Sequence, residues 1–210
     1  MTTAEIFIIV LTAILAITGV LGVVIFNGQL SAMQRQNQDG RDAFIISNRA
    51  FVFLSRYELN PILREDGSVA KWEVNPIFEN TGPTPTKNLV IKINSQLIPV
   101  APPDNEFPVD QEGPLNHGSM IRPHATATIE GPVITVEQID QIVAGRQRFY
   151  IWGWAEYRDV FANTKCHRIR FFNSMKVFGD YRRRPGPDGI PLRMPVIGVF
   201  NDPDDECSHQ

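Results

Sequence analysis

Residues Ile6–Phe26 read IFIIVLTAILAITGVLGVVIF, a run of 21 residues without a charged side chain. At a rise of about 1.5 Å per residue this run would form a helix about 31 Å long, which matches the hydrocarbon core of a bilayer. Its apolar residues fall on all sides, whereas a buried core helix or a surface helix shows a polar stripe. We therefore expect a tail over 1–5, a transmembrane helix over 6–26, and the lipid bilayer as a partner.

A cleaved signal peptide is the main alternative for this segment. The leader Met1–Glu5 has no Lys or Arg, and the apolar run exceeds the usual length of about 7–15 residues. No convincing cleavage site follows Phe26. An uncleaved anchor in a bacterial inner (plasma) membrane is the better interpretation.

Few charges bear on the orientation of this single-pass segment. No Lys or Arg precedes it, and Arg35 and Arg41 follow it within the range of the positive-inside bias. This count places the C-terminal part in the cytoplasm by a margin of only two residues. A periplasmic location stays open as the alternative.

Thr18 and Gly22 form a small-xxx-small pair within the apolar run. Such pairs let two membrane helices approach closely, so a weak homo-oligomer or a protein partner could form through this face. Small residues are also common in membrane helices that do not associate.

The segment 27–47 is polar and rich in Gln and Asn, and it contains Gly40. We expect a short stalk helix or linker here, because Gly and Asn weaken a helix and fewer than two heptads have apolar core positions.

Residues 48–175 change to the two-residue period of β-strands. The segments expected as strands are Ala50–Tyr57, Val69–Asn80, Leu89–Asn94, His124–Ile129, Arg148–Tyr157 and Lys165–Phe172. Pro76 predicts an edge position or a bulge in the second segment, because proline lacks the amide that a central strand donates. Apolar residues on both faces predict that Arg148–Tyr157 is central. Ile98–Arg122 is proline-rich and is expected to be a long loop.

A short helix is expected over Thr135–Gly145. Thr135 and Gln138 have the spacing of a capping box, and Gly145 suits the C-cap. Val136, Ile139 and Val143 would form its apolar face. The predicted fold class is therefore mainly β: an N-terminal transmembrane helix, then an antiparallel, immunoglobulin-like β-sandwich with one short inserted helix.

The segment 176–210 is proline-rich, with a basic triplet at Arg182–Arg184 and an acidic end. We expect an extended or disordered tail. The triplet could touch anionic lipid, but a solvated tail is the simpler interpretation. Cys166 and Cys207 could form a disulfide in a periplasmic domain, yet two free thiols are the favoured expectation.

Composition narrows the functional classes. The 210 residues carry 20 Lys and Arg against 23 Asp and Glu, a formal net charge of −3. A nucleic-acid-binding protein usually has a basic excess, so nucleic acid is not an expected partner.

The sequence contains no phosphate loop, dinucleotide fingerprint, zinc-protease motif, nucleophile elbow or C-x-x-C pair. Cys166 and His167 would point to opposite faces of one strand, which argues against a shared metal ion. His124 could meet His167 across strands, although nothing requires it. No cofactor, metal site or enzymatic activity is expected from these residues.

Tyr157, Arg158 and Asp159 form the densest polar cluster. A binding site would use the Arg158 guanidinium for a carboxylate or phosphate. A structural hairpin, in which Asp159 accepts backbone hydrogen bonds, is favoured. The row of Tyr150, Trp152 and Trp154 could stack a ligand, but core packing is the favoured interpretation.

Several of these segments together resemble a known family. They are Arg49-Ala50-Phe51-Val52, Asn80-Thr81-Gly82-Pro83-Thr84-Pro85-Thr86, and Gly153-Trp154-Ala155-Glu156-Tyr157-Arg158-Asp159-Val160-Phe161. The chain resembles, over residues 6–172, uncharacterised bacterial single-pass inner-membrane proteins with a C-terminal β-sandwich. These carry an R-A-[FY]-[VI] strand, an N-x-G-x-T-P-A turn and a G-x-[IV]-x-Y-x-D-x-[FW]-G hairpin. Thr86 replaces the usual Ala and Ala162 a frequent Gly, which affects only turn geometry. The resemblance implies an architecture and no activity.

Three functions follow as hypotheses. The first is a membrane-anchored protein whose β-sandwich is a binding or interaction module. The second is a membrane-anchored enzyme of unrecognised type with a polar site near Arg158, Asp159 and His167. The third is a structural subunit of a membrane assembly.

Overall fold

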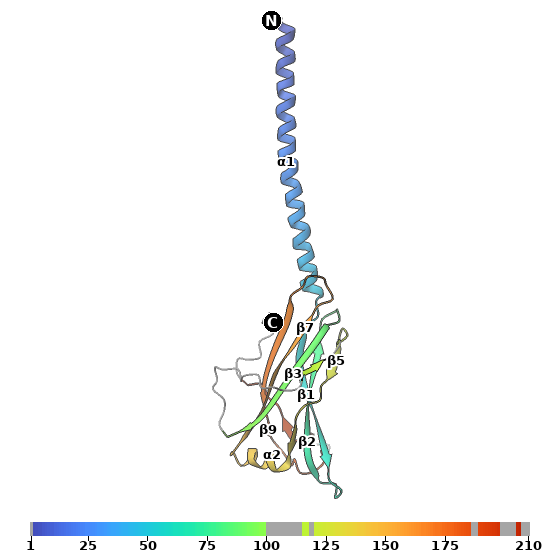
Figure 1. The fold of residues 1–210 in the computed structure, drawn as a ribbon, viewed down its shortest axis with the longest axis vertical. Helices are drawn as coiled ribbons and strands as arrows, with labels where there is room; N and C mark the ends of the chain where they lie inside the picture. The colour runs from blue at the N-terminus through green and yellow to red at the C-terminus, as the bar shows by residue number, and fades with distance from the viewer. Residues whose placement is uncertain (1, 100–114, 118–119, 186–188, 198–204, 207–210) are drawn as a thin grey trace. The chain divides into compact units, whose positions relative to one another are not determined.

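A computed structural model describes residues 2–99, 115–117, 120–185, 189–197 and 205–206. One long helix, α1 (Thr3–Asn48), is followed by a mainly β region with antiparallel sheets (Figure 1). The chain divides into two compact units, Met1–Ser47 and Asn48–Gln210.

Helix α1 is continuous for 46 residues, so the expected stalk, 27–47, is helical and continues the helix of the apolar run without a linker. Its Gln, Arg and Met residues are good helix formers, and they carry the helix through Gly40. The side chains of the apolar run are exposed to the surroundings along its whole length. Among the described residues, α1 is the one helix long and apolar enough to cross a membrane.

The first sheet consists of β1 (Val52–Leu63), β2 (Val69–Asn80), β5 (Ala125–Thr128) and β6 (Val133–Thr135). Strand β2 is central, with β1 on one side and β5 and β6 on the other, so the expected edge position of Pro76 is wrong. Pro76 lies where the partner side changes from β6 to β5, and its carbonyl accepts the Ile129 amide at 3.0 Å. The missing proline amide therefore falls at an interruption of the neighbouring strand.

The second sheet has the order β11-β8-β7-β3-β4. Its strands are β3 (Lys87–Ile98), β4 (Leu115–His117), β7 (Arg148–Arg158), β8 (Cys166–Ser174) and β11 (Asp205–Glu206). Strand β7 is central, as its apolar faces predicted. Gly153 in β7 packs tightly, because a Cβ there would lie 1.9 Å from the Lys92 carbonyl oxygen and 2.9 Å from the Phe171 ring.

The two sheets share one hydrophobic core. The rings of Phe78, on β2, and Phe171, on β8, meet edge to face at 5.6 Å. Trp72, also on β2, is fully buried in the same core, and its Nε1–H donates to the Tyr181 carbonyl oxygen at 3.0 Å. The core therefore joins residues far apart in the sequence, including the region after β8.

The inserted helix, α2 (Val136–Val143), begins as predicted. Gln138 donates its amide to the Thr135 hydroxyl, and its side chain accepts the Thr135 amide, which completes the capping box. The C-cap is Ala144, whereas Gly145 follows it with φ at +69°. Val143 was expected in the apolar face but is 58% exposed.

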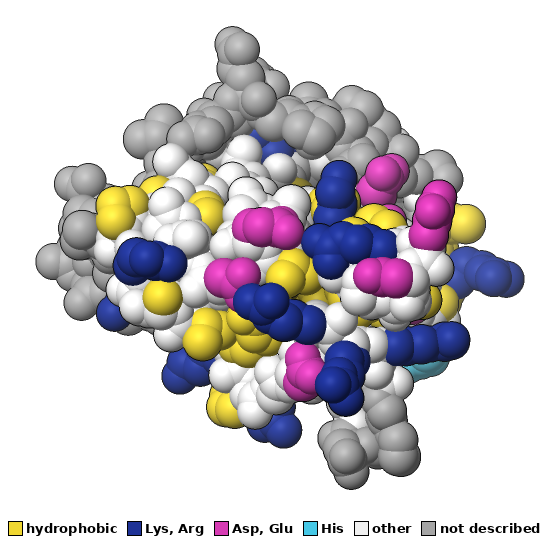
Figure 2. Space-filling model, turned by 90° about the horizontal axis from the view of Figure 1, so that it is seen from below, with side chains coloured by type: hydrophobic (Ala, Val, Ile, Leu, Met, Phe, Trp, Pro, Cys, Tyr) yellow, Lys and Arg dark blue, Asp and Glu magenta, His cyan; other side chains and the backbone are white. Residues whose placement is uncertain are grey.

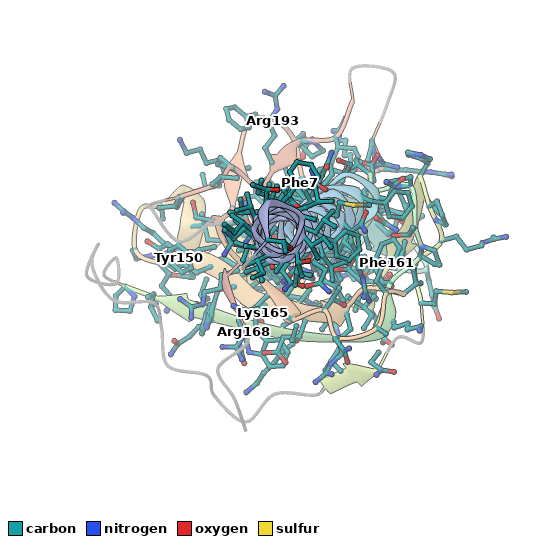
Figure 3. All side chains as sticks on the ribbon, turned by 90° about the horizontal axis from the view of Figure 1, so that it is seen from above. Phe7, Tyr150, Phe161, Lys165, Arg168 and Arg193 are labelled. Carbon is teal, nitrogen blue, oxygen red and sulfur yellow. The ribbon has the colours of Figure 1, made fainter. Side chains whose placement is uncertain are left out.

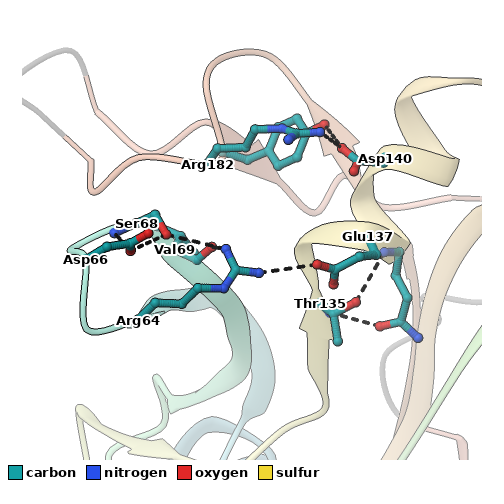
Figure 4. A network of polar contacts seen from close by, with 10 residues as sticks. Arg64, Asp66, Ser68, Val69, Thr135, Glu137, Asp140 and Arg182 are labelled. Carbon is teal, nitrogen blue, oxygen red and sulfur yellow. Dashed lines mark hydrogen bonds and ion pairs between the residues drawn. The ribbon is translucent and has the colours of Figure 1, made fainter.

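The described part of 176–197 is packed rather than disordered, which corrects the expectation of an extended or disordered tail. Strands β9 (Lys176–Val177) and β10 (Leu192–Arg193) pair, and Leu192 is buried in the core. Tyr181 and Arg182 both contact the Asp140 carboxylate on α2 at 2.5 Å. In Figure 4, Arg64 next to β1 contacts Glu137 on the same helix at 3.2 Å. The second compact unit accordingly extends past the expected boundary at 175.

Cys166 is disulfide-bonded, so the expectation of a free thiol there is wrong. Cys207 is the other cysteine of the chain and lies outside the described residues. Much of the expected loop 98–122 also lies outside them. Residues 115–117 form β4, and Ile121 is buried beside Thr86.

Candidate functional site

Asp159 lies where the chain enters the β region after α1. It is 3% exposed. Its Oδ1 accepts the amide of Ala50 at 3.0 Å, and its Oδ2 lies 2.8 Å from Nε2 of His167. The hairpin carboxylate therefore holds the first residues of the β region in place, as the structural interpretation of this hairpin predicted.

Both ring nitrogens of His167 have partners. Nδ1 lies 3.4 Å from a guanidinium nitrogen of Arg49, while Nε2 faces Asp159. A guanidinium only donates, so Nδ1 accepts and the Nε2–H donates to the carboxylate. These two contacts hold the His167 ring between Arg49 and Asp159.

The other two residues of the predicted hairpin site separate. The Tyr157 hydroxyl accepts the Val52 amide at 3.3 Å and donates to the Ala50 carbonyl at 3.4 Å, and its ring stacks on His167. Arg158 is exposed at the end of β7 and does not join this cluster. The hypothetical enzyme site of Arg158, Asp159 and His167 thus retains only its last two members.

The turn after β2 contacts the same first residues of the β region. We call the whole group the entry cluster: Arg49, Ala50, Asn80, Tyr157, Asp159 and His167. Asn80 is fully buried; its Oδ1 accepts the amides of Phe51 and Gly82, and its Nδ2 donates to the Thr84 carbonyl. A Cβ on Gly82 would lie 2.3 Å from the Arg49 carbonyl oxygen, so the close approach requires glycine. The buried Thr86 hydroxyl accepts the Ile121 amide, so threonine is accommodated here.

No group of three or more potential metal-ligating side chains occurs among the described residues. His124 and His167 belong to different sheets: His124 lies in the turn before β5, with φ at +52°, and His167 lies on β8. The entry cluster is an arrangement of mutual hydrogen bonds.

Thr18 and Gly22 lie on α1. The Thr18 hydroxyl donates to the Ile14 and Leu15 carbonyls at 3.0 Å, and open space surrounds a Cβ built on Gly22. This face is therefore sterically accessible to a second helix. Association through it stays a prediction.

The aromatic row on β7 forms a second, smaller cluster on the sheet face away from the main core. Tyr150 stacks on Phe172 at 5.4 Å, Trp152 contacts Phe172, and both Tyr150 and Trp152 are buried. Trp154 differs, since the Arg168 guanidinium lies 5.2 Å from its ring. Packing thus accounts for two of the three residues.

A groove of about 650 Å³ lies at the start of β7, whereas the entry cluster lies where this strand finishes. Its walls come from the end of α2, the start of β7, the end of β8 and the region around β9. The apolar lining residues are Ile142, Val143, Tyr150, Met175, Val177, Phe178 and Ile197. Val143 and Phe178 are 58% and 64% exposed, which leaves apolar surface open to solvent.

The polar lining of the groove is basic. Arg148 and Lys176 contribute to its walls, Gln147 and Ser174 are neutral, and no described lining residue is acidic. Within the described part of the chain, neither Arg148 nor Lys176 has an ion-pair partner. Arg193 lies close by, with its guanidinium 5.1 Å from the Phe178 ring centroid, and projects at the periphery of the domain in Figure 3. Figure 2 views the α2 end of the domain, where yellow apolar side chains lie among dark blue basic and magenta acidic ones.

Sequence reasoning missed this groove. Val143 fits the apolar period of α2, but the helix ends there and the side chain lies outside the core. The segment expected to be extended or disordered included Lys176, Val177 and Phe178. The exposed apolar residues and the basic residues of the groove do not repeat with the period of a helix or a strand. No pattern in the sequence could therefore have revealed the groove.

Comparisons with known proteins leave the family open. No protein-family model matches the chain, and no curated protein matches it. One solved structure, described as a crystal structure of a protein from Archaeoglobus fulgidus, is similar to 58% of this chain and 94% of its own, with 10% identity and a TM-score of 0.28.

Proposed function

We propose that this protein is a single-pass, membrane-anchored protein of the bacterial inner membrane whose β domain is an immunoglobulin-like sandwich that serves as a binding module. The uncharged run 6–26, exposed along α1, supports the anchor. This is also the architecture implied by the resemblance to bacterial single-pass proteins. The groove is the observation that carries the binding function, because it combines exposed apolar walls with cations that have no ion-pair partner among the described residues.

The side of the membrane is part of this proposal. The two arginines after the apolar run favour a cytoplasmic domain, whereas the disulfide of Cys166 favours an oxidising compartment. A two-residue charge bias is the weaker argument, since disulfides are rarely kept in reducing cytoplasm. We therefore propose a periplasmic domain.

Membrane fractionation tests the anchor. Leu15→Arg and Ile17→Arg place charges near the middle of the run, each at a cost of about 3 kcal/mol in a bilayer. We expect the unmodified chain to stay in the pellet after alkaline carbonate extraction, and the double variant to be released.

Gln34→Arg with Gln36→Arg is the matched control, because it adds the same charge to α1 outside the apolar run. It should remain in the pellet. Release of the unmodified chain by carbonate, or retention of the Leu15 and Ile17 double variant, would contradict the proposed anchor.

A further inference from the structure

We propose that the groove between α2, β7 and β9 binds one long-chain carboxylate, with its acyl chain along the apolar walls and its head between Arg148 and Lys176. This inference rests on the proposed binding function and names the chemical class of its ligand. Three features of the groove favour this ligand: the chemistry of its walls, the charge at its rim and its size.

The walls favour an acyl chain over a peptide. Seven of the twelve lining residues are apolar, and only Gln147 and Ser174 are uncharged polar groups. A bound peptide brings amides and carbonyls that need partners, and an extended peptide usually obtains them from an open strand edge. Strand β9 is paired with β10, so its edge is engaged there. An acyl chain needs no such partners.

The charge of the lining selects an anionic head. Arg148 and Lys176 lie in the groove without an ion-pair partner, and no acidic side chain lines it, in the part of the chain that the structure describes. A guanidinium presents a planar fork that matches a carboxylate, and an ammonium adds a point charge. Arg193 is held over the Phe178 ring at the same end of the domain and adds to the positive field.

The size of the groove suits a single chain. Its volume of about 650 Å³ falls within the range of small-molecule sites, about 300–1,000 Å³. Tyr150 and Ile197 line it and also pack with Phe172, so one wall of the groove is backed by the buried aromatic cluster.

Photo-crosslinking of the full chain in phosphatidylcholine nanodiscs tests the proposal. The probe is palmitate with a diazirine in its acyl chain, and labelled peptides are identified by mass spectrometry. We expect labels within 142–148 and 176–178, in addition to any on the apolar run of α1. Unlabelled palmitate should compete for the groove peptides, whereas hexadecanol at the same mole fraction in the bilayer should compete at least fivefold less well.

Variants of the rim and walls sharpen the test. Arg148→Gln and Lys176→Gln should each lower groove labelling about fivefold, which corresponds to roughly 1 kcal/mol of ion pairing. Lys71→Gln, at an exposed position on β2 outside the groove, is the matched charge control and should not change it. Val143→Trp should block the groove, whereas Val133→Trp, an exposed change outside it, should not.

Three results would overturn the ligand assignment. The first is labelling confined to α1, and the second is equal labelling of the Arg148, Lys176 and Lys71 variants. The third is a cross-linked pair of chains through the groove that palmitate does not displace, which would make a second copy the occupant. Stronger competition by a lysophosphatidate than by palmitate would replace the carboxylate with a phosphate head. None of these results alters the carbonate extraction, so failure of the ligand and failure of the anchor are distinguishable.

Discussion

Asp159 illustrates how one buried carboxylate can fix the entry of a chain into a domain. Asp159→Ala would leave the Ala50 amide and the His167 Nε2–H without their acceptor inside the fold. Hydrogen bonds to charged groups contribute about 1.5–3 kcal/mol, so we expect a loss of about 2–3 kcal/mol in the free energy of unfolding. Denaturant unfolding of the full chain in detergent, followed by near-UV circular dichroism, measures it.

Glu65→Ala is the matched control for that change, because it removes an exposed carboxylate in the turn between β1 and β2. It should alter stability by less than about 0.5 kcal/mol. Equal effects of the two substitutions would show that the Asp159 contacts do not stabilise the fold.

Gly153 gives a second prediction at the scale of single residues. A Cβ at this position would lie 1.9 Å from a backbone oxygen of β3, so Gly153→Ala must shift β7 away from its neighbour. We expect a marked loss of stability, at least about 3 kcal/mol, or failure of the β domain to fold. Gly40→Ala, with open space around it on α1, should leave the unfolding midpoint of the β domain unchanged.

At the scale of elements, a polar contact joins α2 to the turn after β9. The hydrogen bond from Tyr181, assisted by Arg182, lowers the pKa of Asp140 below its usual value. A carboxylate with a lowered folded pKa stabilises the fold above its unfolded pKa, and this contribution is lost as the pH falls through the folded pKa. Stability should therefore decrease below about pH 4, more steeply than in Asp140→Asn.

Thermal unfolding midpoints between pH 2 and pH 6 measure this dependence in both chains. The two curves should run parallel near pH 6 and converge in acid, because the variant has no carboxylate left to protonate at position 140. Parallel curves throughout would exclude a stabilising role of the ionised Asp140.

The elements also show what sequence reasoning can reach. The capping box of Thr135 and Gln138 is a local pattern, and the predicted start of α2 is confirmed. Strands β9 and β10 have two residues each, too few to show a period, and their pairing depends on distant residues. The meeting of Asp159 with His167 was within reach, because both lie near one hairpin. Arg49 was not, because its contact with His167 spans 118 positions.

At the scale of the whole molecule, the proposed anchor helix precedes a β domain that is entered through a buried polar cluster and has a groove at the start of β7. The helix and the central place of β7 follow from composition and period. The groove does not, because its lining residues come from the stretches 142–150 and 174–178 and from Ile197, which share no common period. The proposed function therefore depends on surface that no local pattern marks.

Oxidation state and location are linked at this scale. With the domain in the periplasm, the unreduced chain should contain no thiol that reacts with maleimide, and Cys207→Ser should make Cys166 reactive. Non-reducing gel electrophoresis after maleimide labelling in intact cells measures this. A chain whose thiols react fully without reduction would favour the cytoplasmic alternative.

Protease protection of the full chain expressed in bacterial cells tests both the proposed membrane anchor and the proposed periplasmic location of the β domain. Spheroplasts are treated with protease before and after lysis, and fragments are detected with separate tags at the two ends of the chain. We expect digestion of the β domain in unlysed spheroplasts, with a protected membrane fragment that contains residues 6–26. A chain that is digested only after lysis would contradict the proposed side, and a chain recovered in the soluble fraction would contradict the anchor itself.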